Sequence, residues 1–227
     1  SLVYNSLISK KLRKTKGARK RIARSTQSLA GFSLLLGLRP DESATPINHH
    51  TILFPEDYDA EFDSIFTTRT PVKNPTIYLC APLDESMVKE SGAQSLFVLV
   101  NAPVHDATGA TGWNWNDENF NRDYANSIID QIQARGISIR DRLDVMEIRT
   151  PADLERSVNA PGGAIYGTSS NGAQSAFLRA RNRSPLKGLY CVGGSAHPGG
   201  GLPLVGLSAE IVANAIGNTQ NASRLLH

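Results

Sequence analysis

The sequence predicts an α+β fold, in which a mainly antiparallel sheet covered by helices precedes a C-terminal strand, glycine-rich turn and helix. Two observations predict it. At least four short β-branched or apolar runs bounded by Pro and Gly occur before residue 104. Near the C-terminus, the apolar run 189–192 leads into a turn with five glycines and then a stretch of small and apolar residues.

The expected strands before residue 104 alternate with turn signals. They are residues 29–38, 49–54, 76–80 and 96–100. A short helix is expected to open at Pro55, with Tyr58, Phe62, Ile65 and Phe66 on one face, so that it covers the sheet and turns a polar outer face to solvent.

Two further helices carry clear boundary signals. Residues 117–135 place Phe120, Tyr124, Ile128 and Ile132 four apart, and Gly136 follows as a C-terminal cap. Thr150, Pro151 and Asp153 form a helix start of the capping-box type. A last helix is expected from about Pro203 to Ile216, ending at Gly217.

Length and composition limit the class of protein. With 227 residues and 40% hydrophobic content, the chain has material for one domain or two small ones. It contains no uninterrupted apolar run of about 18 residues and no secretory signal. Cys80 and Cys191 lie in apolar strand-like runs, which favours free buried thiols and a reducing cytoplasm. Residues 1–5 read like the tail of a strand without an initiator Met, which indicates a fragment.

The positive charge is concentrated between Lys10 and Arg24, where nine basic residues occur without an acidic one. Such a segment can dock on anionic lipid headgroups. The interpretation that we favour is a solvated, mobile loop. The segment has no interleaved aromatic residues, so no nucleic-acid partner is expected.

The most informative segment is the glycine-rich turn that joins the apolar run 189–192 to the last helix. Glycines allow the backbone to approach a flat ring or a phosphate, and the first N–H groups of a helix attract negative charge. The predicted cofactor-binding residues are Gly193, Gly194, His197, Pro198, Gly199, Gly200, Gly201, Leu202, Pro203, Leu204 and Val205. Neither G-x-G-x-x-G nor G-x-x-x-x-G-K-[ST] occurs in the sequence.

Three other features leave the catalytic chemistry open. His197 is the only titratable residue inside the turn, and we expect it to shape the turn, so we name no catalytic base. His49 and His50 are expected to point to opposite faces of a strand, with no metal-ligand spacing to other residues, so no metal site is predicted. Trp113 and Trp115 fit either a membrane interface or the packing of a loop.

Residues 189–203, Leu-Tyr-Cys-Val-Gly-Gly-Ser-Ala-His-Pro-Gly-Gly-Gly-Leu-Pro, resemble the C-terminal signature of phytoene desaturases and related carotenoid oxidoreductases. Four upstream segments resemble the same family in the same order. They are residues 49–54, 74–78, 150–154 and 162–167.

The resemblance implies FAD as the cofactor. Gly193 and Gly194 would lie against its ribityl and pyrophosphate groups, and residues 197–201 would run beside the isoalloxazine ring. The helix from Leu202 and Pro203 would direct N–H groups at the N1 and O2 edge, with Leu204 and Val205 as first-turn contacts.

By the same resemblance, residues 1–160 form part of a substrate-binding domain with a basic insert at 10–24. Residues 161–227 return to a Rossmann-type FAD domain whose N-terminal dinucleotide-binding half is absent, so this fragment alone is expected to be inactive. The implied reaction is desaturation of a long polyene such as phytoene in carotenoid biosynthesis, by a cytoplasmic protein peripheral to the membrane. Two alternatives stay open: a carotenoid ketolase or terminal oxidase of the same superfamily, and a non-catalytic truncated binding module.

Overall fold

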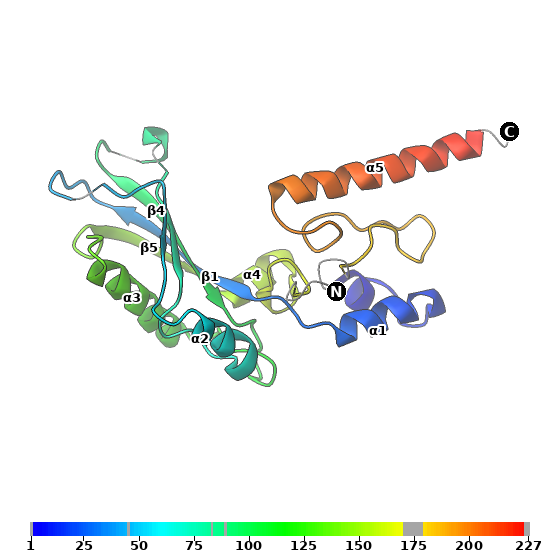
Figure 1. Cartoon of the computed structure of the whole chain (residues 1–227), viewed down its shortest axis with the longest axis horizontal. Helices are drawn as coiled ribbons and strands as arrows, with labels where there is room; N and C mark the ends of the chain where they lie inside the picture. The colour runs from blue at the N-terminus through cyan, green and yellow to red at the C-terminus, as the bar shows by residue number, and fades with distance from the viewer. Residues whose placement is uncertain (1, 45, 83, 89, 170–178, 225–227) are drawn as a thin grey trace. The chain divides into compact units, whose positions relative to one another are not determined.

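The computed structural model describes residues 2–44, 46–82, 84–88, 90–169 and 179–224, and the chain divides into two compact units (Figure 1). One unit comprises residues 29–164. The other combines residues 1–28 with residues 165–227. The predicted boundary at 160/161 lies close to the end of the first unit, and the grouping of residues 1–28 with the C-terminal segment had no counterpart in the sequence analysis.

The unit of residues 29–164 is built on a five-stranded antiparallel sheet with the order β2-β3-β4-β1-β5. Its strands are β1 (Ala30–Leu38), β2 (His50–Leu53), β3 (Ile77–Cys80), β4 (Gln94–Ala102) and β5 (Leu143–Arg149). The four strands predicted before residue 104 are confirmed, as is the mainly antiparallel sheet. Strand β5 was not predicted, because charged residues interrupt its apolar alternation at the edge of the sheet.

One face of the sheet is closed by helix α3 (Glu118–Ala134), which Figure 1 shows alongside the strands. Ile128, Ile129 and Ile132 of α3 are fully buried, in one cluster with Phe32 of β1 and Val98 of β4. The predicted four-residue spacing in this helix is therefore confirmed.

Both ends of α3 are capped by local chemistry. The Asp117 side chain accepts hydrogen bonds from the N–H groups of Asn119 and Phe120 at the start of the helix. Gly136 adopts a φ of 85° just after its end, as a C-terminal glycine cap requires. Both predicted boundaries are confirmed.

The opposite face of the sheet, here called the second face, is also rich in apolar side chains. Strand alternation and register place Ile52 opposite Tyr78 and Tyr78 opposite Leu99, while Leu35 pairs with Phe97 in the neighbouring row. Exposed fractions are 52% for Ile52, 41% for Leu35 and 57% for Val145, which also lies on this face. An apolar surface of this kind is unusual on an ordinary solvated sheet face.

The expected helix after Pro55 is α2 (Asp59–Phe62), which continues into the π-helical turn η3 (Asp63–Thr68). Ile65 is buried, as expected for a helix that covers the sheet. The exposed positions of the helix are polar apart from Ala60, as expected, and include Asp59, Asp63 and Thr67. Tyr58, expected on the inward face, is instead 45% exposed, in an aromatic row of successive ring contacts along this segment. The row consists of Phe54, Tyr58, Phe62 and Phe66.

Glu61 ties this helical segment to β4 and to the residue just before β3 from a buried position. Its carboxylate accepts a hydrogen bond from Thr76 N at 2.7 Å and from Asn101 Nδ2 at 2.8 Å. Burial, and next the Glu61 carboxylate, raise the pKa of Tyr124, whose hydroxyl donates to the Val72 carbonyl at 2.9 Å.

Three short helical segments complete the unit. Segment η4 (Glu85–Met87) lies in the loop before β4, and α4 (Pro151–Val158) and η5 (Pro161–Gly163) follow β5. The capping box of α4 is confirmed: Thr150 Oγ1 accepts from Asp153 N at 3.2 Å, and Thr150 N donates to Asp153 Oδ2 at 2.8 Å.

In the second unit, residues 1–28 are helical where other conformations were expected. Residues 1–5 were predicted as the tail of a strand, but residues 3–5 belong to the π-helical turn η1 (Val3–Leu7). The basic segment, interpreted as a loop, contains η2 (Arg13–Thr15) and helix α1 (Lys16–Arg24). Arg19 fixes the start of α1 by donating to Thr15 Oγ1 and to the carbonyls of Ile8 and Ser9.

The C-terminal segment also differs from two expectations. Residues 189–192 do not form a buried strand: Tyr190 makes an isolated bridge with Arg183, and Val192 is exposed. Helix α5 (Leu202–Arg224) continues through Gly217, since one glycine in a helix costs only about 1 kcal/mol relative to alanine. In the part of the chain that the structure describes, no helix is long and apolar enough to cross a bilayer.

We predict that Glu61→Gln lowers the free energy of unfolding by about 1 to 3 kcal/mol. Thr76 N–H and the Asn101 amide both donate hydrogen bonds to the Glu61 carboxylate. The glutamine amide nitrogen is itself a donor, so it would face one of these donors without accepting its hydrogen bond. Chemical denaturation measures the effect. Glu56→Gln, at an exposed position shortly before the same helix, is the control and should change stability by less than about 0.5 kcal/mol. Equal effects of the two substitutions would contradict the assigned role of Glu61.

Candidate functional site

The glycine-rich turn at residues 193–201 leads directly into α5, as predicted. Gly193 and Gly201 have φ values of 110° and 95°, which side-chain-bearing residues rarely adopt. A Cβ added at either position would meet no atom within 4 Å. The turn therefore leaves open space along its backbone beside the first turn of α5.

Two buried polar residues that sequence reasoning missed hold this turn in place. The amide nitrogen of Asn182 lies 3.1 Å from the Cys191 carbonyl, 2.8 Å from the His197 carbonyl and 2.9 Å from Ser208 Oγ. Ser208 lies on α5, is fully buried, and accepts a hydrogen bond from Gly193 N at 3.3 Å. Asn182 and Ser208 thus tie the start and the middle of the turn to the helix that follows.

The His197 side chain is exposed, whereas its backbone N–H and carbonyl both form hydrogen bonds. Its N–H donates to the Ala180 carbonyl at 2.9 Å, and its carbonyl accepts from Asn182. These contacts support the interpretation that the residue shapes the turn.

The glycines at the far side of the turn are packed against protein. A Cβ at Gly200 would lie 1.8 Å from Cδ1 of Tyr166, and one at Gly199 would lie 3.2 Å from Nε of Arg179. Arg179 also donates to the carbonyls of Tyr166 and Gly194, both at 3.1 Å. Glycine at position 200 is therefore explained by the approach of the Tyr166 ring.

The start of α5 offers an accessible helix N-terminus. Leu202 is 89% exposed and Leu204 is 38% exposed, while Val205 N donates back to the Gly201 carbonyl at 2.9 Å. The first N–H groups of any helix lack partners within it. Open space at Gly193 and Gly201, together with this helix end, fits the flavin that the resemblance implies.

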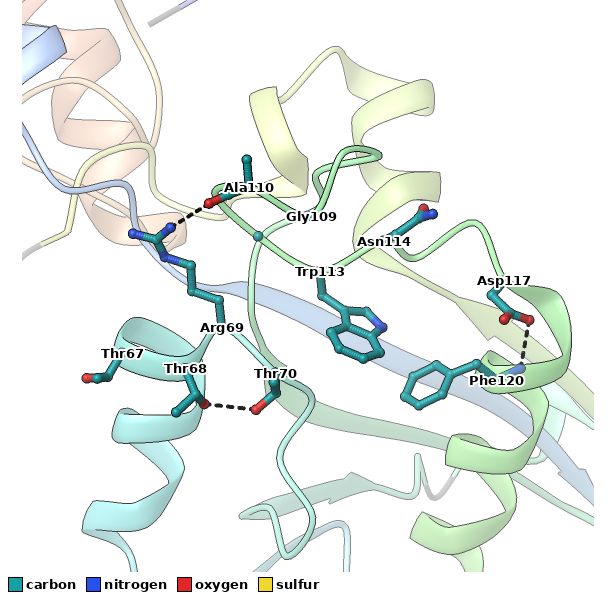
Figure 2. A pocket seen from close by; sticks show the side chains of 11 residues that line it. Thr67, Thr68, Arg69, Thr70, Gly109, Ala110, Trp113, Asn114, Asp117 and Phe120 are labelled. Atoms are coloured by element: carbon teal, nitrogen blue, oxygen red, sulfur yellow. Dashed lines mark hydrogen bonds between the residues drawn. The ribbon is translucent and has the colours of Figure 1, made fainter.

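A separate pocket of about 500 Å³ lies in the unit of residues 29–164 (Figure 2). It is lined by the end of η3 and the loop before α3, namely Thr67, Thr68, Arg69, Thr70, Gly109, Ala110, Gly112, Trp113, Asn114, Asp117 and Phe120. Arg69 bridges its two sides by donating to the Ala110 carbonyl at 2.8 Å, and the Trp113 and Phe120 rings lie 5.2 Å apart. Its two walls are far apart in sequence, so no local pattern predicted it.

Asp106 stabilises the loop on one side of this pocket. Hydrogen bonds from Thr111, and next from Thr108, hold the pKa of its carboxyl well below the ordinary value. The contribution of Asp106 to stability is therefore present above the unfolded-state pKa of about 3.9 and is lost as the pH falls through the lower folded-state pKa.

The tryptophans of the same loop serve packing. Trp115 is 1% exposed and donates from Nε1 to the Pro103 carbonyl at 3.0 Å. Trp113 is half-buried and packs against the hydrophobic cluster. Of the two interpretations of these residues, loop packing is confirmed for Trp115.

The histidine pair departs from the sequence expectation. His49 precedes β2 and His50 begins it, and their rings stack with centroids 4.1 Å apart, so the prediction that they point to opposite faces is wrong. Antiparallel pairing places Cys80 opposite His50. Both cysteines are free thiols as predicted, but they are half-buried, and Cys191 lies outside any strand.

Comparison with known proteins gives a consistent set of relatives, although no family model matches the chain. The chain is 38% identical over 181 residues to a 1-hydroxycarotenoid 3,4-desaturase from Flavobacterium sp. (strain P99-3), a match that covers 78% of this chain and 36% of that protein. It is 33% identical over 205 residues to a hydroxyneurosporene desaturase from Rubrivivax gelatinosus, covering 86% and 36%. A 4,4'-diaponeurosporene oxygenase from Staphylococcus haemolyticus is 28% identical over 190 residues, covering 82% and 36%. The chain thus spans about a third of the length of each of these relatives.

We predict that Gly200→Ala loosens the glycine-rich turn, because its Cβ must displace the Tyr166 ring. Hydrogen exchange at the His197 amide, which is bonded to the Ala180 carbonyl, should become faster by roughly 5-fold or more, corresponding to about 1 kcal/mol.

Gly206→Ala is the matched control. It lies inside α5, where a Cβ meets nothing within 4 Å, and should stabilise the helix by up to about 1 kcal/mol. Unchanged exchange at His197 in the Gly200 variant would mean that the Tyr166 contact does not constrain the turn.

Proposed function

Because the chain belongs to the phytoene-desaturase-like family, matching the C-terminal part of carotenoid desaturases, we propose that it forms part of an FAD-dependent oxidoreductase that desaturates a long polyene. The similarity to several carotenoid desaturases over most of the chain is the observation that carries the proposal. The relatives named for hydroxylated carotenoids favour a substrate of that class.

The glycine-rich turn and α5 are the proposed flavin contacts. Gly193 and Gly201 leave the backbone accessible to a flat ring or a pyrophosphate, and Asn182 and Ser208 hold that backbone rigid from behind. The N–H groups at Leu202 and Leu204 would favour negative charge at the N1 and O2 edge of the flavin. FAD, when bound, supplies the acceptor for a hydride equivalent in the removal of two hydrogens from the polyene.

The proposed Rossmann-type FAD domain would use a strand, a turn and a helix in this part of the chain. Within the described residues, the turn and helix α5 are present, and residues 189–192 form no strand. The apolar faces of α5 support such a domain, since Leu207, Ile211 and Ile216 are 40% to 48% exposed. A helix with apolar exposure of this kind is suited to packing against a sheet.

The second face of the sheet is the proposed surface for the polyene. Its apolar side chains, which include Leu35, Phe97, Leu99 and Ile52, can contact and partly bury a long hydrocarbon chain. The closed core on the α3 side is fully packed and has no equivalent role.

A second candidate function, oxidation of carotenoid ends, is supported by the similarity to a diaponeurosporene oxygenase. The two reactions differ in their atom balance. Desaturation removes two hydrogens and adds no oxygen, whereas end oxidation adds oxygen and requires an oxygen donor.

The experiment that tests the proposal incubates the full-length protein, with FAD, on phytoene and on a hydroxylated acyclic carotenoid, and measures product mass. The expected product has lost two hydrogens for each new double bond and gained no oxygen. Oxygen incorporation would replace the desaturase proposal by the oxidase one, and the absence of any polyene turnover would contradict both.

A matched pair of variants tests the placement of the polyene. Leu35→Lys puts a charge on the second face and should lower turnover at least 10-fold while leaving bound flavin unchanged. Leu7→Lys, at a 70% exposed position in the other unit, is the control and should leave turnover unchanged. Normal turnover by Leu35→Lys would contradict binding on this face.

A further inference from the structure

We propose that His49, His50 and Cys80 form a binding site for a soft divalent cation such as Zn²⁺ at one end of edge strand β2. The ligand atoms of these three side chains all lie within 4.8 Å of one another. The site is separate from the glycine-rich turn and from the pocket beside Trp113, and its existence does not depend on the proposed desaturase function.

The separations are close to those that a metal requires. Ligand atoms of a tetrahedral zinc site with nitrogen and sulfur donors lie about 3.4 to 3.6 Å apart. The two imidazole rings are stacked with an interplanar angle of 15°, so one ring must rotate about its side-chain bonds for both to face one ion, and the exposure of both residues leaves room for that rotation.

The sheet positions the sulfur and one imidazole. Antiparallel register places His50 directly opposite Cys80, and Ala81 N donates to the His49 carbonyl at 2.9 Å, which fixes the backbone just before β2. Because a register slip in a sheet with one packed face would expose the buried side chains, this juxtaposition is strongly specified.

A further contact orients one of the ligands. His50 Nδ1 lies 2.8 Å from the hydroxyl oxygen of Tyr78, so Nε2 is the ring nitrogen left for a metal. Metal-binding histidines commonly use their other ring nitrogen in a hydrogen bond of this kind, which fixes the tautomer and the ring orientation. Tyr78 is therefore a positioning residue for the site.

The donor set determines which ions fit. Two imidazoles and one thiolate suit Zn²⁺ and similar soft or borderline ions, and they are poor ligands for Mg²⁺ and Ca²⁺, which prefer oxygen donors. Three protein ligands leave a fourth position for water or an added ligand, as in open zinc sites.

The test is a titration of the purified full-length protein with Co²⁺, whose thiolate complexes absorb light, followed by competition with Zn²⁺. We expect one Co²⁺ per chain with a thiolate-to-cobalt absorption band that Zn²⁺ abolishes. Cys80→Ser should remove this band, and Tyr78→Phe should keep it while weakening affinity about 10-fold.

Cys191→Ser is the matched control, because it removes the other half-buried free thiol and leaves the three ligands intact. It should retain the band at full intensity. Zn²⁺ should also raise the Tm of the wild-type protein and of Cys191→Ser, with the increase lost in Cys80→Ser. A circular dichroism spectrum equal to that of the wild type identifies folded Cys80→Ser.

Three outcomes would overturn the proposal. They are the absence of a cobalt–thiolate band in the wild-type protein, a band of full intensity in folded Cys80→Ser, and loss of the band in Cys191→Ser.

Discussion

The antiparallel pairing of β1 with β4 is the constraint on which the larger unit depends. The pairing runs in continuous register from Ala30 opposite Ala102 to Leu38 opposite Gln94. Because side chains alternate along each strand, this one register sends Phe32 and Val98 into the core under α3 and sends Leu35 and Phe97 to the second face. The same strand pairing, continued through β3 to β2, brings Cys80 beside His50.

The two candidate surfaces differ in how their shape is maintained. The apolar side chains of the second face are placed there by strand alternation, so this face needs no special backbone conformation. The glycine-rich turn is held by buried polar groups, since Asn182 and Ser208 bond its backbone and leave the outer side of Gly193 and Gly201 open. Under the proposed function, the apolar surface contacts the polyene and the open backbone segment contacts the flavin.

Local sequence signals predicted the parts of the fold that are set by short-range physics. Alternation identified β1 and β4, and capping residues identified the end of α3 and the start of α4. Strand β5 escaped because its edge position tolerates charged residues, and the helix over residues 16–24 escaped because an uninterrupted basic run resembles a solvated loop. The glycine-rich turn was found from composition, whereas Asn182, Ser208 and the pairing of His50 with Cys80 depend on contacts between distant segments.

The run at residues 189–192 is the clearest failure of a local pattern. A continuous apolar stretch predicts a strand buried on both faces, but such burial requires neighbouring strands on either side. Within the described residues no strand flanks this stretch: its backbone bonds to residues 182–184, with Tyr190 bridging to Arg183, and Val192 remains exposed. An apolar run can be buried as a strand only when other segments pair with it and cover its faces.

Hydrogen exchange of the full-length protein with and without FAD tests whether the turn before α5 contacts the flavin. FAD is expected to slow exchange at the amides of Gly193, Gly201 and Leu202, while amides of the edge strand β5 are unaffected. Equal exchange at the turn in both states, with protection appearing elsewhere in the protein, would contradict this contact.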